Sequence, residues 1–151
     1  MGQGGFASYD KRIFLIMGSW DATSFGNDTA NDWVYELEEC DDLSLIKTTI
    51  QKVLDAGDDY IEAPEAEEAV AAAEVLAWLQ GHPGPVNSYT EKVALWVSEN
   101  PLNVPSSLVE KALFVLDRIL DDSSELNEQW DGDAKWVASM ADLRTRLSGE
   151  E

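Results

Sequence analysis

The sequence contains few residues that could cross-link a protein or bind a metal. Cys40 is the only cysteine among 151 residues, and His82 is the only histidine. A single cysteine excludes an intrachain disulfide and fits a reducing compartment such as the cytoplasm. A chain of this length buries about 70% of its unfolded surface, so it needs no cross-link to fold. We therefore expect one cytoplasmic domain with an ordinary apolar core.

Basic residues are scarce. Ten Lys and Arg stand against thirty Asp and Glu, which gives a net charge of -20. No Lys or Arg occurs between Arg12 and Lys47, or between Lys52 and Lys92. Such a chain repels nucleic acid and anionic lipid, so we expect no direct nucleic-acid binding and no membrane partner. The composition favours a basic protein partner, or serves only solubility and adaptation to salt.

Motifs of the common enzyme classes are missing. There is no Walker motif, no G-x-G-x-x-G, no G-x-S-x-G and no pair of cysteines. The segment that starts at Asp55 fails as a calcium loop because Tyr60 stands where the loop needs glycine. His82 lies in a Gly-His-Pro turn and would have to serve any histidine chemistry alone. We therefore expect no catalytic residue, no bound metal and no cofactor.

The segment from Glu62 to Gln80 is the most regular part of the chain. Pro64 suits a first helical turn, and alanine, valine and leucine then cover nearly every side, interrupted by Glu74. Gly81 supplies a stop signal. A helix that is apolar nearly all round belongs in the interior of a helical domain. The sequence thus predicts an all-α fold, a single bundle-like domain of five or six helices around an alanine-rich helix at about residues 62–80.

Apolar spacing predicts the other helices. They lie at about residues 28–40, 43–56, 90–99, 107–120 and 133–147, and residues 124–130 form one or two further turns. The charges of the helix at about 107–120 should face solvent. Residues 1–16 differ in character, with three glycines and a basic pair, and are interpreted as a non-native or alternative-start extension or one short strand. Residues 17–151 then form the single helical domain.

Several segments together resemble a known family. Met17-Gly18-Ser19-Trp20 is followed by Phe25, Asn27, Asp28, Ala30, Asp32 and Trp33; Glu62 to Glu65 leads into the alanine-rich helix; Ser124 to Trp130 precedes a helix with Ala141 to Arg144. This pattern resembles a bacterial family catalogued as domain of unknown function 4259. The resemblance covers Met17 to Leu147, and it implies an all-helical domain and no particular activity. Asp21 and Thr23 replace glycines of the family pattern, so the local turn should differ.

The strongest candidate site lies at the start of the first helix. It comprises Trp20, Phe25, Asn27, Asp28, Asp32 and Trp33. Asp28 and Asp32 are one helical turn apart and could form a metal-binding or general-base pair. Alternatively, Asn27 or Asp28 caps the helix, Asp32 is solvated and the tryptophans are core. Trp78 is a further candidate, as a surface anchor or as a half-buried core residue.

The charge and the missing motifs together favour a non-enzymatic function. We expect an acidic protein-interaction domain, of the immunity or inhibitor type, that masks a basic partner. One alternative is a metal-dependent hydrolase that uses Asp28 and Asp32. Others are a nucleic-acid mimic and a structural subunit.

Overall fold

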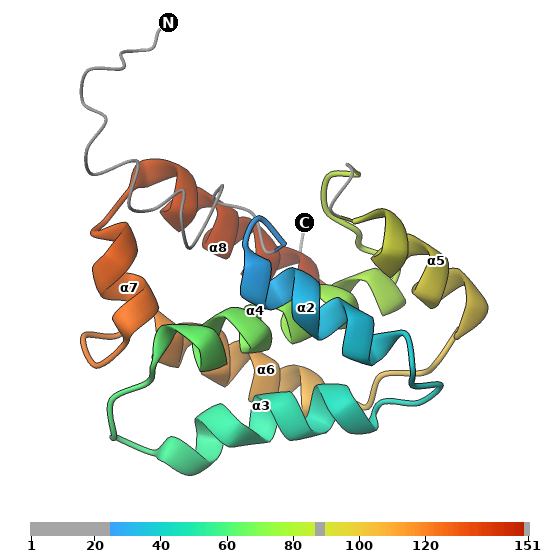
Figure 1. Cartoon of the computed structure of the whole chain (residues 1–151), viewed down its shortest axis with the longest axis horizontal. Helices are drawn as coiled ribbons and strands as arrows, with labels where there is room; N and C mark the ends of the chain where they lie inside the picture. Colours follow the sequence, from blue (N-terminus) through green and yellow to red (C-terminus); the bar gives the residue numbers. More distant parts are fainter. Residues whose placement is uncertain (1–24, 87–89, 150–151) are drawn as a thin grey trace, which may run out of the picture.

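The computed structural model describes residues 25–86 and 90–149 (Figure 1). These residues form the helices α2 (Asp28–Leu37), α3 (Ser44–Ala56), α4 (Ala63–Leu79), α5 (Glu91–Glu99), α6 (Ser106–Ile119), α7 (Glu125–Trp130) and α8 (Ala134–Ser148). The described segments contain no strand, and Ile61 and Ser124 form an isolated bridge. The all-α prediction is confirmed. The described residues form seven helices where five or six were predicted, because the segment indicated as one or two turns forms a separate helix, α7. The proposed extension at residues 1–16 lies outside the described residues.

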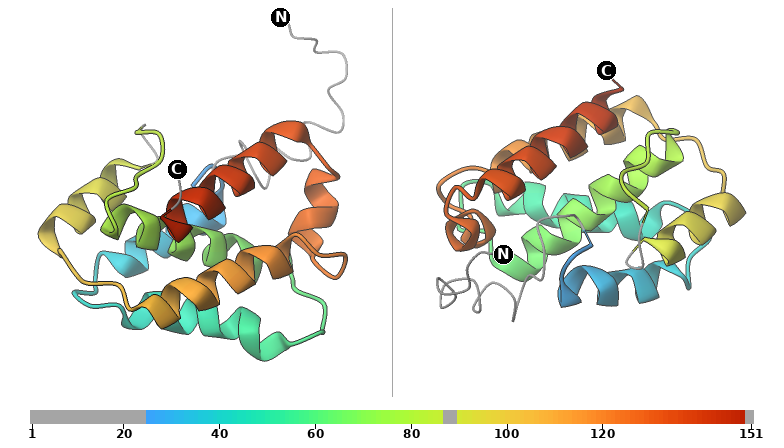
Figure 2. Two further views of the ribbon diagram at one scale, coloured as in Figure 1. Left: turned by 180° about the vertical axis from the view of Figure 1, so that it is seen from behind. Right: turned by 90° about the horizontal axis from the view of Figure 1, so that it is seen from above.

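Helix α4 occupies the centre of the fold, as predicted. Thirteen of its seventeen residues are buried, and it packs against each of the other six described helices. Figure 2 shows it running between α2 and α8, with α3 and α6 beside each other. Ala69, Ala73 and Leu76 are completely buried. Because alanine side chains are short, neighbouring helices can approach this helix from every side.

The ends of α4 follow from local sequence signals. Pro64 lies in the first turn, where its missing N–H breaks no helical hydrogen bond. At the other end, Gly81 adopts a positive φ of 87°, a conformation that favours glycine.

No described helix has the length and apolar character needed to cross a bilayer.

The side chains of Asn27 and Asp133 cap the first turns of α2 and α8. Asn27 Oδ1 accepts a hydrogen bond of 2.7 Å from the Ala30 N–H and so caps α2. Asp133 caps α8 in the same way. Helix α2 ends at Leu37, three residues before the predicted end at 40, and an acidic segment follows it. Carboxylates at a helix C-terminus oppose the helix dipole, which explains the early end.

The start of α4 is bound to the start of α7. The Ile61 N–H donates to the Ser123 carbonyl and the Glu125 N–H donates to the Ile61 carbonyl, both at 2.9 Å. Glu125 Oε1 also accepts from the Ala63 N–H at 2.7 Å. The turn after α6 therefore lies against the segment that joins α3 to α4.

Candidate interaction surface

The cluster predicted at the start of α2 is largely structural. Asn27 and Phe25 are buried, and the Phe25 carbonyl accepts a 2.7 Å hydrogen bond from Asn31 Nδ2. The Asn27 side chain is already used as the helix cap. Trp20, which was also predicted to belong to this site, lies outside the described residues.

Asp28 and Asp32 lie on the exposed side of α2. Within residues 25–86 and 90–149, no group of three or more His, Cys, Asp or Glu side chains is placed to bind a metal ion. The pair therefore has no third ligand in the described part of the chain. A role for the two carboxylates in hydrolysis stays a prediction.

Both described tryptophans of the predicted site are core residues. Trp33 is 1% exposed, and its Nε1–H donates to Thr49 Oγ1 at 2.9 Å. Trp78 is 9% exposed, and its Nε1–H donates to Glu74 Oε2 at 2.9 Å. The surface-anchor interpretation of Trp78 is therefore wrong, because its side chain is buried and Glu74, one turn earlier, accepts the hydrogen bond of the indole N–H.

Glu74 belongs to a polar cluster that the sequence did not predict. Arg146 of α8 donates to both of its carboxylate oxygens, at 2.6 and 2.9 Å, and donates to Asp142 at 2.8 Å. Burial lowers the pKa of Arg146, but the hydrogen bonds and charges of Glu74 and Asp142 outweigh it, and the pKa lies above its usual value. The guanidinium thus remains charged and holds α8 against α4.

Residues of the turn after α4 contact the same polar cluster. His82 Nδ1 lies 3.0 Å from the Arg146 carbonyl oxygen, and the His82 carbonyl accepts from Arg146 Nη1 at 3.2 Å. A Cβ on Gly84 would lie 2.9 Å from Glu74 Oε2, so a side chain there would displace the ion pair. His82 and Glu74 are therefore engaged in joining the ends of α4 and α8.

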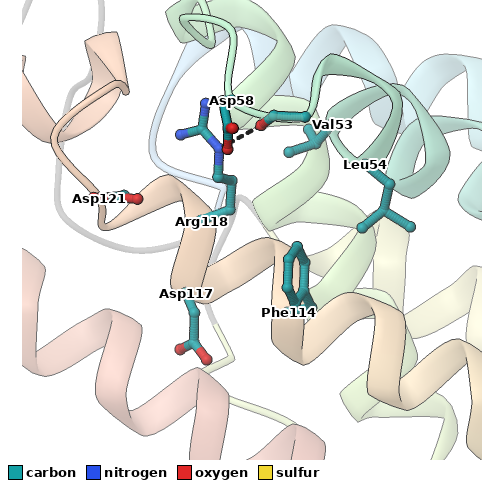
Figure 3. A pocket seen from close by; sticks show the side chains of 8 residues that line it. Val53, Leu54, Asp58, Phe114, Asp117, Arg118 and Asp121 are labelled. Atoms are coloured by element: carbon teal, nitrogen blue, oxygen red, sulfur yellow. Dashed lines mark hydrogen bonds between the residues drawn. The ribbon is translucent and has the colours of Figure 1, made fainter.

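An open groove lies where the end of α3 meets α6. Its volume is about 350 Å³, and its lining is Val53, Leu54, Gly57, Asp58, Phe114, Asp117, Arg118 and Asp121. In Figure 3, Phe114 extends from α6 beside Leu54 of α3, and Asp117 points away toward α8. The Phe114 side chain is 62% exposed. The described exposed tyrosines differ in having polar contacts, since Tyr60 donates to Glu128 and Lys92 lies over the Tyr35 ring.

Arg118 forms the inner wall of this groove. The prediction that the charges of this helix face solvent is wrong here, because Arg118 is only 9% exposed. Its Nε donates to the Gly57 carbonyl at 3.0 Å, its Nη1 to the Ser123 carbonyl at 3.2 Å, and its Nη2 to the Asp59 carbonyl. Arginine has five N–H donors, which lets one side chain connect the turn after α3 to the turn after α6.

The two turns joined by Arg118 are both acidic. With the last turn of each preceding helix, they present exposed carboxylates: Asp55, Asp58 and Asp59 at the end of α3 and after it, and Asp117, Asp121 and Asp122 at the end of α6 and after it. Asp117 pairs with Arg144 at 2.9 Å, and this hydrogen bond lowers its pKa. Six aspartates against Arg118 and Arg144 leave a net charge of -4 on this acidic edge. The sequence showed each acidic turn but gave no sign that they are adjacent.

A comparison with family models gives a match over residues 18–139, to the family described as Domain of unknown function (DUF4259). No curated protein and no solved structure matches the chain.

Proposed function

The chain belongs to the DUF4259 family, and we propose that it is a non-enzymatic, acidic protein-interaction domain that masks a basic protein. The family description names no activity, so the proposal depends on the charge and its arrangement. The proposal includes a cytoplasmic location, where a single unpaired cysteine is stable in the reduced state.

The carrying observation is the acidic edge formed by the last turns of α3 and α6 and the turns that follow them. Carboxylates of like charge repel one another, and the backbone contacts of Arg118 nevertheless hold the two turns together. A concentrated negative potential raises the association rate of a basic partner. The potential equally disfavours nucleic acid and anionic lipid as partners.

The polar groups that resemble enzyme machinery already have structural partners. The single histidine and the buried Glu74 are hydrogen-bonded within the cluster at the ends of α4 and α8. Asn27 is a helix cap. These assignments support an interaction role over catalysis by the same groups.

Capture of partners by the immobilised full chain from the source cell tests the proposal. We expect a basic protein to bind at low salt and to elute by roughly 0.3 M salt, since the Debye length falls from about 10 Å at 0.1 M to about 3 Å at 1 M. Soluble polyglutamate should compete poorly if shape contributes as well as charge. Recovery of no basic protein at low salt would overturn the proposal.

The rival proposal, a hydrolase that uses Asp28 and Asp32, has its own test. Calorimetry with Mg²⁺, Mn²⁺ and Ca²⁺ should show no stoichiometric heat if the domain only binds protein. Stoichiometric binding that disappears in Asp32→Ala would favour the hydrolase.

A further inference from the structure

The groove beside Phe114 combines an apolar wall with an acidic margin. Phe114 and Leu54 provide the apolar side, and Asp58 and Asp121 stand on the margin (Figure 3). Its volume of about 350 Å³ lies at the lower end of the roughly 300–1,000 Å³ of ligand pockets. A side chain with an apolar stem and a cationic end would match both parts.

We propose that this groove binds an arginine side chain of the basic partner, a proposal that rests on the function proposed above. The guanidinium stacks on the exposed face of the Phe114 ring, and its stem lies against Leu54. Asp58 and Asp121 attract the positive charge from the margin.

Arginine fits this site better than lysine for two reasons. A guanidinium is planar and stacks on an aromatic ring, while an ammonium group is compact and strongly hydrated. Arginine is also enriched among the residues that contribute most to protein interfaces. Phe114 itself has no hydroxyl group, so its exposed ring offers stacking and apolar contact alone.

Two cations on α6 bear on the site. Arg118 is buried, and its donors are directed to the carbonyls of Gly57, Asp59 and Ser123. Lys111 is exposed and precedes Phe114 by three residues, which places the two on neighbouring positions of the helix surface. The proposal therefore predicts opposite effects for two neighbouring changes: loss of Phe114 weakens binding, and loss of the Lys111 charge strengthens it.

The probe is an acetylated and amidated peptide, Gly-Lys-Gly-Arg-Gly-Lys-Gly, titrated into the ¹⁵N-labelled full chain. A second peptide replaces the arginine with citrulline, which has nearly the same shape and no charge. We expect the largest amide shifts at residues 53–58 and 113–121, and a Kd that is severalfold higher for the citrulline peptide.

The variants separate the groove from general acidity. Phe114→Ala should raise the Kd for the arginine peptide about two- to fivefold, the range for an exposed cation–π contact. Lys111→Gln should lower it by about 1.5- to fivefold. Leu95→Ala removes an apolar side chain of similar exposure on α5, 57% against 62% for Phe114, and should leave the Kd unchanged. Equal melting temperatures of the variants would show that each is folded.

Three results would overturn the groove proposal. One is a shift pattern centred on Asp28 and Asp32, which would move the site to α2 while a basic partner still stands. Another is an equal effect of Phe114→Ala and Leu95→Ala. The last is the absence of any shift with either peptide; the proposed function is then judged separately, by the capture experiment, which does not depend on this groove.

Discussion

Replacing Arg146 with methionine removes the cation from the cluster that joins α8 to α4. Its guanidinium donates to both oxygens of Glu74, and the two side chains are only 16% and 6% exposed. Methionine keeps much of the length and the apolar stem of arginine. The variant therefore leaves the packing largely intact and leaves the Glu74 carboxylate without its ionic partner.

The expected loss of stability is large for a single substitution. Removal of one partner of a buried ion pair costs about 3–5 kcal/mol. The Trp78 Nε1–H still donates to Glu74, which places the expected value near 3 kcal/mol. For a domain of this size each kcal/mol shifts the melting temperature by about 2–4 °C, so we expect a decrease of roughly 6–12 °C.

Urea unfolding followed by far-UV circular dichroism measures the change in free energy. Arg144→Met is the matched control, since Arg144 also lies on α8 and pairs with Asp117 through side chains that are 46% and 55% exposed. Exposed pairs contribute about 0.2–1 kcal/mol. The Arg146 variant should therefore lose several times more stability than the control.

The double variant Glu74→Met/Arg146→Met completes the test. Apolar residues often replace a buried ion pair at little cost, so the double variant should be more stable than the sum of the two single losses predicts. Equal losses for Arg146→Met and Arg144→Met would refute the assignment, as would strict additivity in the double variant.

Other substitutions probe the same framework. Gly84→Ala should cost about 1–3 kcal/mol in a urea melt, because its Cβ would lie 2.9 Å from Glu74 Oε2. Asn27→Ala removes the cap of α2, and calorimetric unfolding should show a loss of about 0.5–2 kcal/mol; an unchanged midpoint would contradict the capping role. The hydrogen bond from Arg144 lowers the pKa of Asp117 below its ordinary 3.8, so its stabilising effect is present above that pH and is lost as pH falls through the folded-state pKa. The stability difference between wild type and Asp117→Asn should accordingly shrink below pH 3.8, and a constant difference across that range would count against the pair.

The central helix could be predicted because its signal is local. A run of alanine, valine and leucine on all sides requires an interior position, whatever surrounds it. Pro64 and Gly81 mark its ends through backbone chemistry, and the observed limits Ala63–Leu79 lie one residue inside the predicted 62–80. The place before an apolar helical pattern likewise predicted Asn27 or Asp28 as the cap of α2, and in the structure it is Asn27.

The partners of charged residues could not be predicted, because they are distant in the chain. Glu74 and Arg146 are separated by 72 positions, and Arg118 reaches Gly57 across 61. Helical periodicity shows which side of a helix is apolar but not which helix lies opposite. The long side chain of an arginine can also turn inward from a helix position that the pattern assigns to solvent. Arg118 does so when it donates to backbone carbonyls. The Phe114 groove was missed for the same reason, since its two walls come from α3 and α6.

The use of arginine across the described residues bears on what the protein can bind. Arg118, Arg144 and Arg146 each make contacts within the chain, to carbonyls or to carboxylates. The exposed cations that remain in residues 25–86 and 90–149 are lysines. The described arginines are thus used in contacts within the chain, and the surface presents mainly carboxylates. Such a surface is complementary to a partner with exposed arginines, because arginine forms bidentate and stacked contacts better than lysine does. Charge would then direct the approach of that partner, and the one exposed phenylalanine of the described surface, Phe114, would provide a fixed point of contact.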